Sequence, residues 1–567
     1  MKQKFHLLFW ALLAILAASC NKNNPPMPDP VPDEYGVSLY AVEEWFSDGE
    51  ATLELSLSEA RDKDVKVYMA LDESSTIDAL RLTFPELVIV PAGRIGAEVK
   101  VSVKSRGMDV GEYKAVFRIA RVVNFHESEV NTATVSLKVD VKEESTWSDV
   151  PDFKPVKTFP TIIITTDENR SPSGIDKEIY TPGTVVFKDP DGMYSDVPEL
   201  SVRMRIRGRG NTSWNNPKKG YKIKLDERNK VFGMKGDKDW AILAEYSDGT
   251  LMRNQTAMQI SRIMGMEWTP DCCSAEVIFD GQSLGMYTII EHKEVANSKI
   301  QMQPGAFYLE LDDKIEDNDE RFKTNHYYKV IKFKDPDAPT AEQRSYVQKF
   351  FRTFEDALAS KSGTAEYLAY RDLVNMDSFV RNYLVQELTK NCDGNFRLST
   401  PLVLENDVLK IPMVWDFDLA FANAQIQGYF PLEDVVPGTA CYIRTELDGD
   451  GPTGWFVKCA GGRPYGWEDP NGQTGWLQRM WRDPEFVAMV KDVWNEKYMD
   501  LLTVPGYMDA LFSLYEDAIK REWEIWKSKN SGNRQRAPKG TVQAQYDALR
   551  QFYVDRLEWM NTAINKL

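Results

Sequence analysis

Residues 391–421, NCDGNFRLSTPLVLENDVLKIPMVWDFDLAF, place three aspartates around a pattern typical of a β-hairpin. Asp393 lies beside a glycine, and two extended apolar segments flank a polar turn within residues 402–415. The second segment ends in Asp416 and Asp418, one residue apart. One aspartate can orient a hydroxyl while another holds Mg²⁺ on nucleotide phosphates, so the pattern favours phosphoryl transfer. Taken alone, the stretch fits solvated loop acids equally well.

The composition is that of a folded chain with an acidic surface. Its 567 residues suggest two to four domains, and 43% hydrophobic residues with 15 tryptophans supply a core. The formal net charge of −17 argues against a nucleic-acid partner, because binding to phosphate backbones requires clustered lysine and arginine.

The first 20 residues predict export. Lys2 and Lys4 precede an apolar run over residues 5–18, which is shorter than the roughly 20 residues of a membrane span. The run ends in Ala-Ala-Ser before Cys20, and this resembles a bacterial lipoprotein signal in which Cys20 becomes lipidated. An ordinary secretory signal is the alternative. Residues 21–34 are a Pro/Asn-rich tether. From the signal and the lipid we expect a cell-envelope protein, at the outer membrane or cell surface, that is anchored to the membrane through its N-terminal lipid.

Residues 35–142 consist of short segments in which apolar and polar side chains alternate. Such segments cover residues 51–57, 65–69, 98–103 and 113–119, among others. The pattern predicts an all-β sandwich of immunoglobulin-like type, which would serve as a spacer or adhesion module. A polar, proline-containing linker, residues 143–158, follows it.

Residues 159–567 combine strand and helix patterns and predict an α+β domain. Strand patterns prevail before residue 291, apart from a helical pattern over residues 251–264. Helical patterns dominate after residue 341 and again from residue 476 to the end, which gives the domain a helical C-terminal part. Residues 428–475 are rich in glycine, proline and aromatics and predict a long insertion.

The cysteines and acidic clusters suggest little further chemistry. No cysteine pair has zinc-site spacing, and Cys441 and Cys459 are candidates for a disulfide, with free thiols as the alternative. Residues 447–451 carry part of a calcium-loop pattern without its terminal glutamate, and the acidic residues 310–313 are expected to be a solvated loop.

Basic residues in and after a glycine-rich stretch are candidates for contacting phosphates. Residues 205–214, RIRGRGNTSW, can form a loop whose amides and arginines hold an anion, although a plain tight turn fits as well. The candidates are Arg207, Arg209, the strand lysines Lys222 and Lys224, and Arg253 at a helix start. Arg253 suits a phosphate or a carboxylate, including a salt bridge between domains.

Five ordered motifs resemble the CotH kinase family. They are RGRGNTSWNNPKKGYKIKLD, AILAEYSDGTLMRN, GMYTIIEHKE, ELTKNCDGNFRLST and VWDFDLAF, and the resemblance covers about residues 159–567. It implies an atypical protein-kinase fold that uses ATP with Mg²⁺ or Mn²⁺. The predicted chain is therefore multidomain, an immunoglobulin-like sandwich followed by a kinase-like α+β domain.

The resemblance also implies roles for individual residues. Asp393 matches the hydroxyl-orienting catalytic aspartate, Asp416 matches the magnesium-binding aspartate, and Asp418 adds a carboxylate near the metal. Either Lys222 or Lys224 matches the phosphate-contacting lysine. Glu291 matches a motif near the nucleotide cleft.

Two departures from the kinase pattern concern the metal and the lysine. Leu398 stands where kinases place a metal-binding asparagine, so Asn395 or Asn391 is the substitute ligand. The helix over residues 251–264 contains no glutamate to pair with the lysine, and Glu245 is the nearest one.

The motifs favour an enzyme that transfers phosphate from ATP to a protein Ser/Thr or another hydroxyl acceptor. A non-catalytic surface protein for adhesion or glycan binding is the alternative. The acceptor of the enzyme, or the ligand of the non-catalytic protein, is an unidentified protein or glycan. A glycoside hydrolase that uses Asp416 and Asp418 ranks last.

Overall fold

The computed structural model describes residues 35–47, 49–77, 81–85, 87–103, 105, 108, 110–140, 156–210, 212–296, 299–312, 320–391, 396, 398–423, 451–455, 475–526 and 540–567. The chain divides into two compact units, Met1–Glu144 and Ser145–Leu567. Several predictions fall outside the described residues. They concern the lipidated Cys20, the tether, Asp393, Asn395 and the Cys441–Cys459 pair.

The first unit consists of two four-stranded antiparallel sheets. One has the order β1 (Val37–Ala41), β2 (Glu50–Leu57), β6 (Gly96–Val103) and β4 (Leu82–Thr83). The other has the order β5 (Leu87–Val90), β3 (Val65–Leu71), β7 (Gly111–Val123) and β8 (Thr132–Val139). This confirms the prediction of an all-β N-terminal region.

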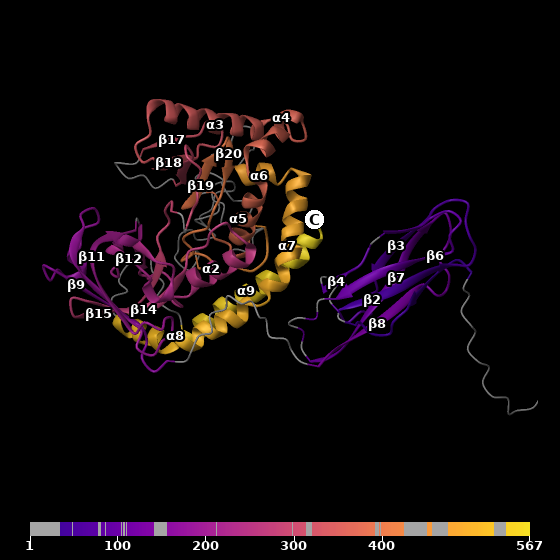
Figure 1. Cartoon of the computed structure of the whole chain (residues 1–567), viewed down its shortest axis with the longest axis horizontal. Helices are drawn as coiled ribbons and strands as arrows, with labels where there is room; N and C mark the ends of the chain where they lie inside the picture. The colour runs from indigo at the N-terminus through magenta and orange to yellow at the C-terminus, as the bar shows by residue number, and fades with distance from the viewer. Residues whose placement is uncertain are drawn as a thin grey trace, which may run out of the picture. The chain divides into compact units, whose positions relative to one another are not determined.

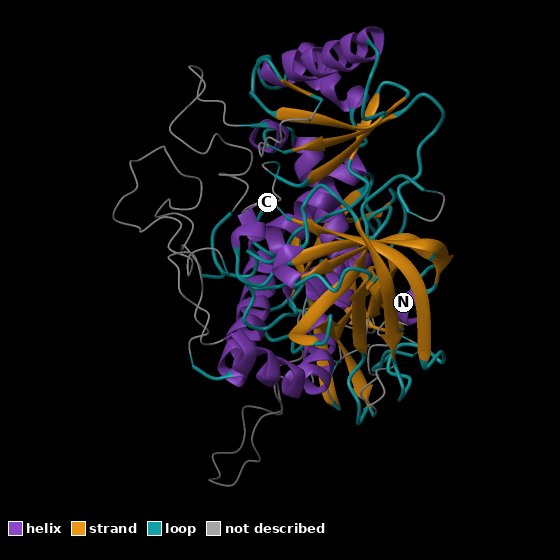
Figure 2. Cartoon of the chain, turned by 90° about the vertical axis from the view of Figure 1, so that its left-hand side faces the viewer, coloured by secondary structure: helices purple, strands orange, loops and turns teal. Residues whose placement is uncertain are grey.

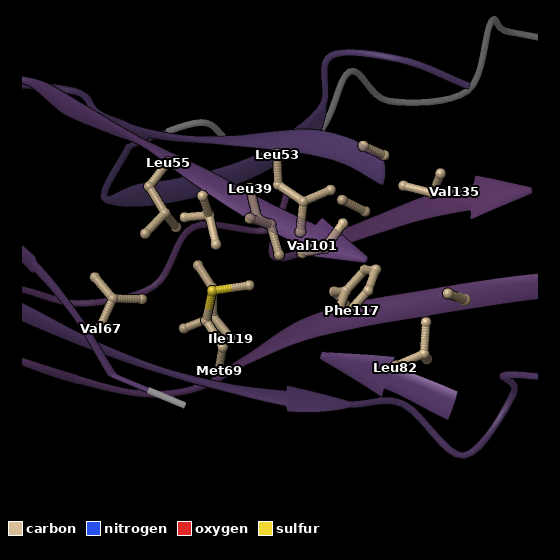
Figure 3. Packing of buried hydrophobic residues seen from close by; sticks show 14 of the residues in the cluster. Leu39, Leu53, Leu55, Val67, Met69, Leu82, Val101, Phe117, Ile119 and Val135 are labelled. Atoms are coloured by element: carbon tan, nitrogen blue, oxygen red, sulfur yellow. The ribbon is translucent and has the colours of Figure 1, made fainter. Parts of the chain in front are cut away.

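The core of the first unit comes from the alternation seen in the sequence. Every second side chain of a strand points to the same face, so the apolar set of each sheet is buried together. Figure 3 shows Leu53, Leu55 and Val101 opposite Met69 and Phe117, and all five are almost fully buried. Each such side chain contributes about 1.5–3 kcal/mol by its burial.

The second unit begins with a closed seven-stranded barrel. Its order is β10 (Thr181–Lys188), β11 (Glu199–Arg209), β12 (Gly220–Asn229), β13 (Asp237–Leu243), β15 (Gln282–Glu291), β14 (Cys272–Phe279) and β9 (Thr161–Thr166). The parallel pair β14–β9 closes it. The barrel interior is filled by residues such as Ile206, Ile223 and Trp240, which are paired across three neighbouring strands. The residues that alternate with them along each strand point outward. The sequence patterns missed β13, because its first three residues are charged.

A second sheet has the order β17 (Arg321–Lys323), β18 (Val330–Asp335), β16 (Phe307–Leu311), β19 (Thr400–Glu405) and β20 (Val408–Lys410). The predicted hairpin is β19–β20, although its second strand ends at Lys410. The expectation that residues 310–313 form a solvated loop was wrong for Glu310 and Asp312. Both are buried. Glu310, which lies in β16, pairs with Lys293, and Asp312 pairs with Lys332.

Helices separate and cover the two sheets. They are α2 (Arg253–Met264), α3 (Ala341–Ala359), α4 (Ala365–Leu368), α5 (Met376–Leu388), α6 (Trp476–Met480), α7 (Pro484–Leu501), α8 (Val504–Trp526) and α9 (Val542–Asn565). The helical C-terminal part is confirmed. Figures 1 and 2 show the barrel at one end of the unit and the second sheet with α3 at the other. Among the described residues, none of the helices has the length and apolar character needed to cross a bilayer.

A buried ion pair joins α8 to the barrel. Lys218 Nζ donates to Glu522 Oε1 over 2.8 Å, and the Met286 amide donates to Glu522 Oε2 over 2.8 Å. Gly285 has φ +79°, and a Cβ there would come within 1.9 Å of Glu522 Oε2. Glycine is therefore required for this close approach.

Candidate functional site

The turn after the hairpin presents Asp416 to solvent. Asp416 is exposed and has φ +71°, a left-handed conformation that aspartate tolerates better than most residues. The buried Asn391 donates from Nδ2 to the Asp416 carbonyl oxygen over 2.9 Å. Ser399 Oγ lies 3.4 Å from Asp416 Oδ2. The segment that leads to Asp393 is thereby held directly against Asp416, although Asp393 itself is not described.

Asn254 links this turn to the barrel side of the site. Its Oδ1 accepts from the Phe417 amide over 2.8 Å. Its Nδ2 donates to both Glu245 carboxylate oxygens, over 3.1 and 3.0 Å. Sequence reasoning did not select Asn254, since its only signal was its place next to Arg253 in the MRN segment. The side chain is 5% exposed, so it positions the turn from behind.

Glu245 is a buried carboxylate in a strained position. It has φ +50° and lies between β13 and α2. Burial, and to a smaller extent the Asp248 charge, raise the pKa of Glu245 to about 7, against the opposing effects of Asn254, Thr288 and Lys218. The carboxyl therefore titrates near neutral pH.

We expect Glu245→Gln to change stability in a pH-dependent way. Because the folded-state pKa is raised, the wild type loses stability as pH rises from about 4.5 to about 7, and the glutamine variant does not. The variant should gain about 3 kcal/mol on the wild type over that window, which corresponds to about 1.4 kcal/mol for each unit of the pKa change, with a constant difference above it. Urea titrations at several pH values measure this. Glu227→Gln, at an exposed position of β12, is the control, and a pH-independent difference for Glu245→Gln would contradict the assignment.

Arg209 ends β11 beside these acids. Burial lowers the pKa of its guanidinium, and the charges of Asp416, Glu245 and Asp418 oppose that shift. Its guanidinium carbon is 6.0 Å from the centre of the Trp415 ring, and Lys293 Nζ is 5.6 Å from the same ring. Two cations thus lie close to the indole ring of Trp415, the residue before Asp416.

Further cations surround His292, which follows β15. Burial lowers the pKa of His292 well below its usual value, and Lys222, Arg209, Lys293 and Lys299 lower it further, so the ring is neutral at pH 7. Lys222 Nζ lies 3.0 Å from Asp239 Oδ1 and is 15% exposed. Lys224 Nζ lies 3.6 Å from the other oxygen of Asp239 and is 41% exposed. Lys222 lies opposite Arg207, one outward-facing position closer to Arg209 than Lys224, and its charge acts on His292.

Two further candidates, Arg207 and Arg253, contact other groups of the protein. Arg207 donates to the Lys177 carbonyl oxygen over 3.0 Å and lies over the Tyr180 ring. Arg253 is buried and binds the Asp248 carboxylate and the Ala420 carbonyl oxygen, so it contacts a carboxylate within its own unit.

Glu291 lies at the end of β15 and accepts from the Asp271 amide over 2.8 Å. Burial raises the pKa of Glu291 to about 7. Its other oxygen is buried without a described hydrogen-bond partner.

The residues around Asp416 fit a hard divalent cation in part. Asp416 offers an exposed carboxylate, and Asp418 adds a second one two residues later. Oxygen ligands of this kind suit Mg²⁺ and Mn²⁺. Within the described ranges, no three acidic, histidine or cysteine side chains gather as a metal site. Leu398 is 6% exposed and faces the protein interior.

Comparisons with known proteins identify one family. A family model described as CotH kinase protein matches residues 206–560. No curated protein matches the chain. A solved protein of unknown function from Bacteroides ovatus is 12% identical, with 37% of this chain and 95% of that chain covered and a TM-score of 0.15.

Two further solved structures are similar to the same degree. The calcium-binding domain CBD12 of CALX1.1 is 9% identical, covers 34% of this chain and 79% of its own, and has a TM-score of 0.17. A multidomain protein including DUF1735 from Bacteroides ovatus is 12% identical, covers 38% and 90%, and has a TM-score of 0.14. Such TM-scores support no inference about fold or function.

Proposed function

The chain belongs to the CotH kinase family, and from this we propose that its second unit transfers the γ-phosphoryl group of ATP to a hydroxyl acceptor with Mg²⁺ or Mn²⁺. One observation supports this most directly. The guanidinium carbon of Arg209, at the end of a glycine-containing strand, lies 6.0 Å from the centre of the Trp415 ring, next to Asp416, and the charges of Asp416 and Asp418 oppose the lowering of its pKa. An arginine and paired carboxylates at one place can hold phosphates and their metal.

In this proposal the basic residues bind the phosphates and the acidic residues bind the metal. Arg209 and Lys222 bind phosphate oxygens, and Lys293 adds positive charge beside Trp415. Asp416 and Asp418 hold the metal, which when bound neutralises charge on the phosphates. Asn391 and Asn254 fix the backbone on either side of Asp416. Asp393 orients the acceptor hydroxyl, with Asn395 as a further ligand.

The fold and location of the protein extend this proposal. We propose a kinase-like arrangement in which the barrel and α2 form one lobe and the second sheet with α3 and α5 the other. The first unit is a sandwich of immunoglobulin-like type that separates the enzyme from its anchor. Lipidation at Cys20 attaches the protein to the cell envelope. We also place Arg207 and Lys224 at the edge of the nucleotide site. The proposal does not use the other two candidates for nucleotide contacts, Arg253 and Glu291.

A non-catalytic surface protein is the second candidate function. Leu398 is buried where kinases have a metal-binding asparagine, which favours a protein that binds nucleotide or glycan without turnover. Measured phosphoryl transfer separates the two.

The test is phosphoryl transfer from labelled ATP with Mg²⁺ or Mn²⁺, together with calorimetric nucleotide binding. We expect the wild type to bind ATP in a metal-dependent way and Arg209→Gln to weaken binding about tenfold, through a lost charge-assisted contact. Arg352→Gln, at an exposed position of α3, is the matched control. Absence of nucleotide binding by the wild type would refute the proposal, and binding without transfer would favour the non-catalytic alternative.

A further inference from the structure

The outer face of the barrel carries a row of cations on two neighbouring strands. We name it the basic row, and its members are Arg203, Arg205, Arg207 and Arg209 on β11 and Lys222 and Lys224 on β12. The β11 members alternate with the interior residues Met204 and Ile206, so all four point outward. This concentration of positive charge occurs in a chain whose formal net charge is −17.

Nearby acids, Asp167, Glu178 and Asp239, neutralise the basic row only in part. Arg205 lies directly opposite Lys224 and Arg207 directly opposite Lys222 in the antiparallel register. Like charges in such cross-strand pairs destabilise a sheet. Asp239 is shared between both lysines and therefore neutralises them incompletely.

Arg205 is the member least engaged by the protein. It is exposed, and its described contact is with the Tyr180 ring at 5.9 Å, with no described carboxylate in ion-pair range. Arg203 differs, since both its terminal nitrogens donate to Asp167 over 2.7 Å. Arg207 Nη1 lies 3.7 Å from Glu178 Oε2, and its Nε atom is buried. Arg205 is therefore the member in the middle of the row that is most available to an anion.

The basic row leads into the proposed phosphoryl-transfer site. Side chains become less exposed along β11, from Arg203 at 51% to Arg207 at 30%. The guanidinium carbon of Arg209 lies 6.0 Å from the centre of the Trp415 ring, the residue before Asp416. Six residues of strand span about 20 Å. A ligand lying along the row would therefore have one end at the acidic turn.

We propose that the basic row docks the acceptor, as an extended acidic peptide whose serine or threonine lies at the Arg209 end. The spacing favours a peptide. Alternate side chains of an extended chain repeat every 6–7 Å, the same repeat as the arginines of β11. Glutamates at alternate positions can each form a charge-assisted pair with one arginine, with Arg205 the main contributor. The acceptor role rests on the proposed function, and the docking itself does not.

The experiment measures docking and transfer separately. A fluorescein-labelled peptide has a serine followed by glutamates at alternate positions, and three comparison peptides carry glutamine, lysine or the same glutamates in one consecutive block. Anisotropy without nucleotide gives the affinity, at low salt and at high salt. Transfer from labelled ATP gives KM and kcat for each peptide. Arg205→Glu is the test variant, and Arg352→Glu, on α3, is the charge-matched control.

We expect the alternating acidic peptide to bind tightest, with affinity that falls as salt increases. Arg205→Glu should weaken binding and raise the peptide KM about tenfold or more, with ATP binding unchanged. Binding that survives Arg205→Glu, equal binding of the lysine peptide, or binding of dextran sulfate without binding of the peptide would each overturn the docking proposal. Docking without transfer would leave this surface supported and count against the proposed function alone.

Discussion

Asp416→Asn is expected to reduce phosphoryl transfer by about 100-fold or more, because it removes an exposed carboxylate at the proposed metal. Asparagine keeps the side-chain shape and tolerates the left-handed backbone at φ +71°. The Asn391 bond to the Asp416 carbonyl oxygen does not depend on the side chain, so the fold should persist. Transfer from labelled ATP, and the dependence of ATP affinity on Mg²⁺, measure the effect.

The same hairpin offers a matched control for this change. Asp407 also has a left-handed backbone, at φ +60°, and accepts from the Tyr346 hydroxyl over 2.8 Å at the opposite end of the hairpin. Asp407→Asn makes the same chemical change away from the site and should leave transfer unaltered. If Asp416→Asn retains full transfer and metal-dependent binding, Asp416 is not a metal ligand.

Arg556→Met is expected to lower the unfolding free energy of the second unit by about 3–5 kcal/mol, because it leaves the Glu387 carboxylate buried without its cation. Both side chains are fully buried, and Arg556 Nη2 donates to Glu387 Oε1 over 2.7 Å. Arg556 also donates over 2.8 Å to the carbonyl oxygens of Pro452 and Gly454. The Glu387 contact joins α9 to the end of α5, and the other two join α9 to residues 451–455. Denaturant unfolding of the full chain measures the loss.

A partly exposed pair between α9 and α8 is the control. Arg550 donates to Asp509 over 2.8 and 3.0 Å, and the two side chains are 38% and 49% exposed. Arg550→Met should cost less than about 1 kcal/mol. Adding Glu387→Leu to Arg556→Met should recover part of the loss, because the buried charge is then gone. Equal costs for the two arginine changes would contradict the assigned role of the buried pair.

Sequence patterns were sufficient where a structure repeats with a short period. The alternation at residues 51–57 predicted β2, and the helical pattern after residue 341 predicted α3, since burial of one face follows from local order. They failed for β13 and for Glu310. The charged residues at the start of β13 and in β16 are neutralised by partners from distant segments, such as Lys299 for Asp237 and Lys293 for Glu310.

The candidate site shows the same division. Asp416 and Asp418 were selected from the hairpin pattern, and the family was recognisable from ordered motifs. Asn254 was not selected, because its importance comes from three hydrogen bonds to two residues that lie 9 and 163 positions away. Arg253 was a candidate for phosphate, but Asp248, five residues earlier, binds it in the fold.

Local order along the chain thus determined the all-β first unit, the helical C-terminal part, the hairpin and its acids. Only the tertiary structure decided that Arg209 lies over Trp415, next to Asp416, that Asn391 and Asn254 hold the turn from two sides, and that the cations of β11 and β12 form one row. The physical reason is the range of the interactions. Side-chain periodicity is set by neighbouring residues, whereas ion pairs and hydrogen bonds depend on distances that closure of the barrel and packing of α2 impose.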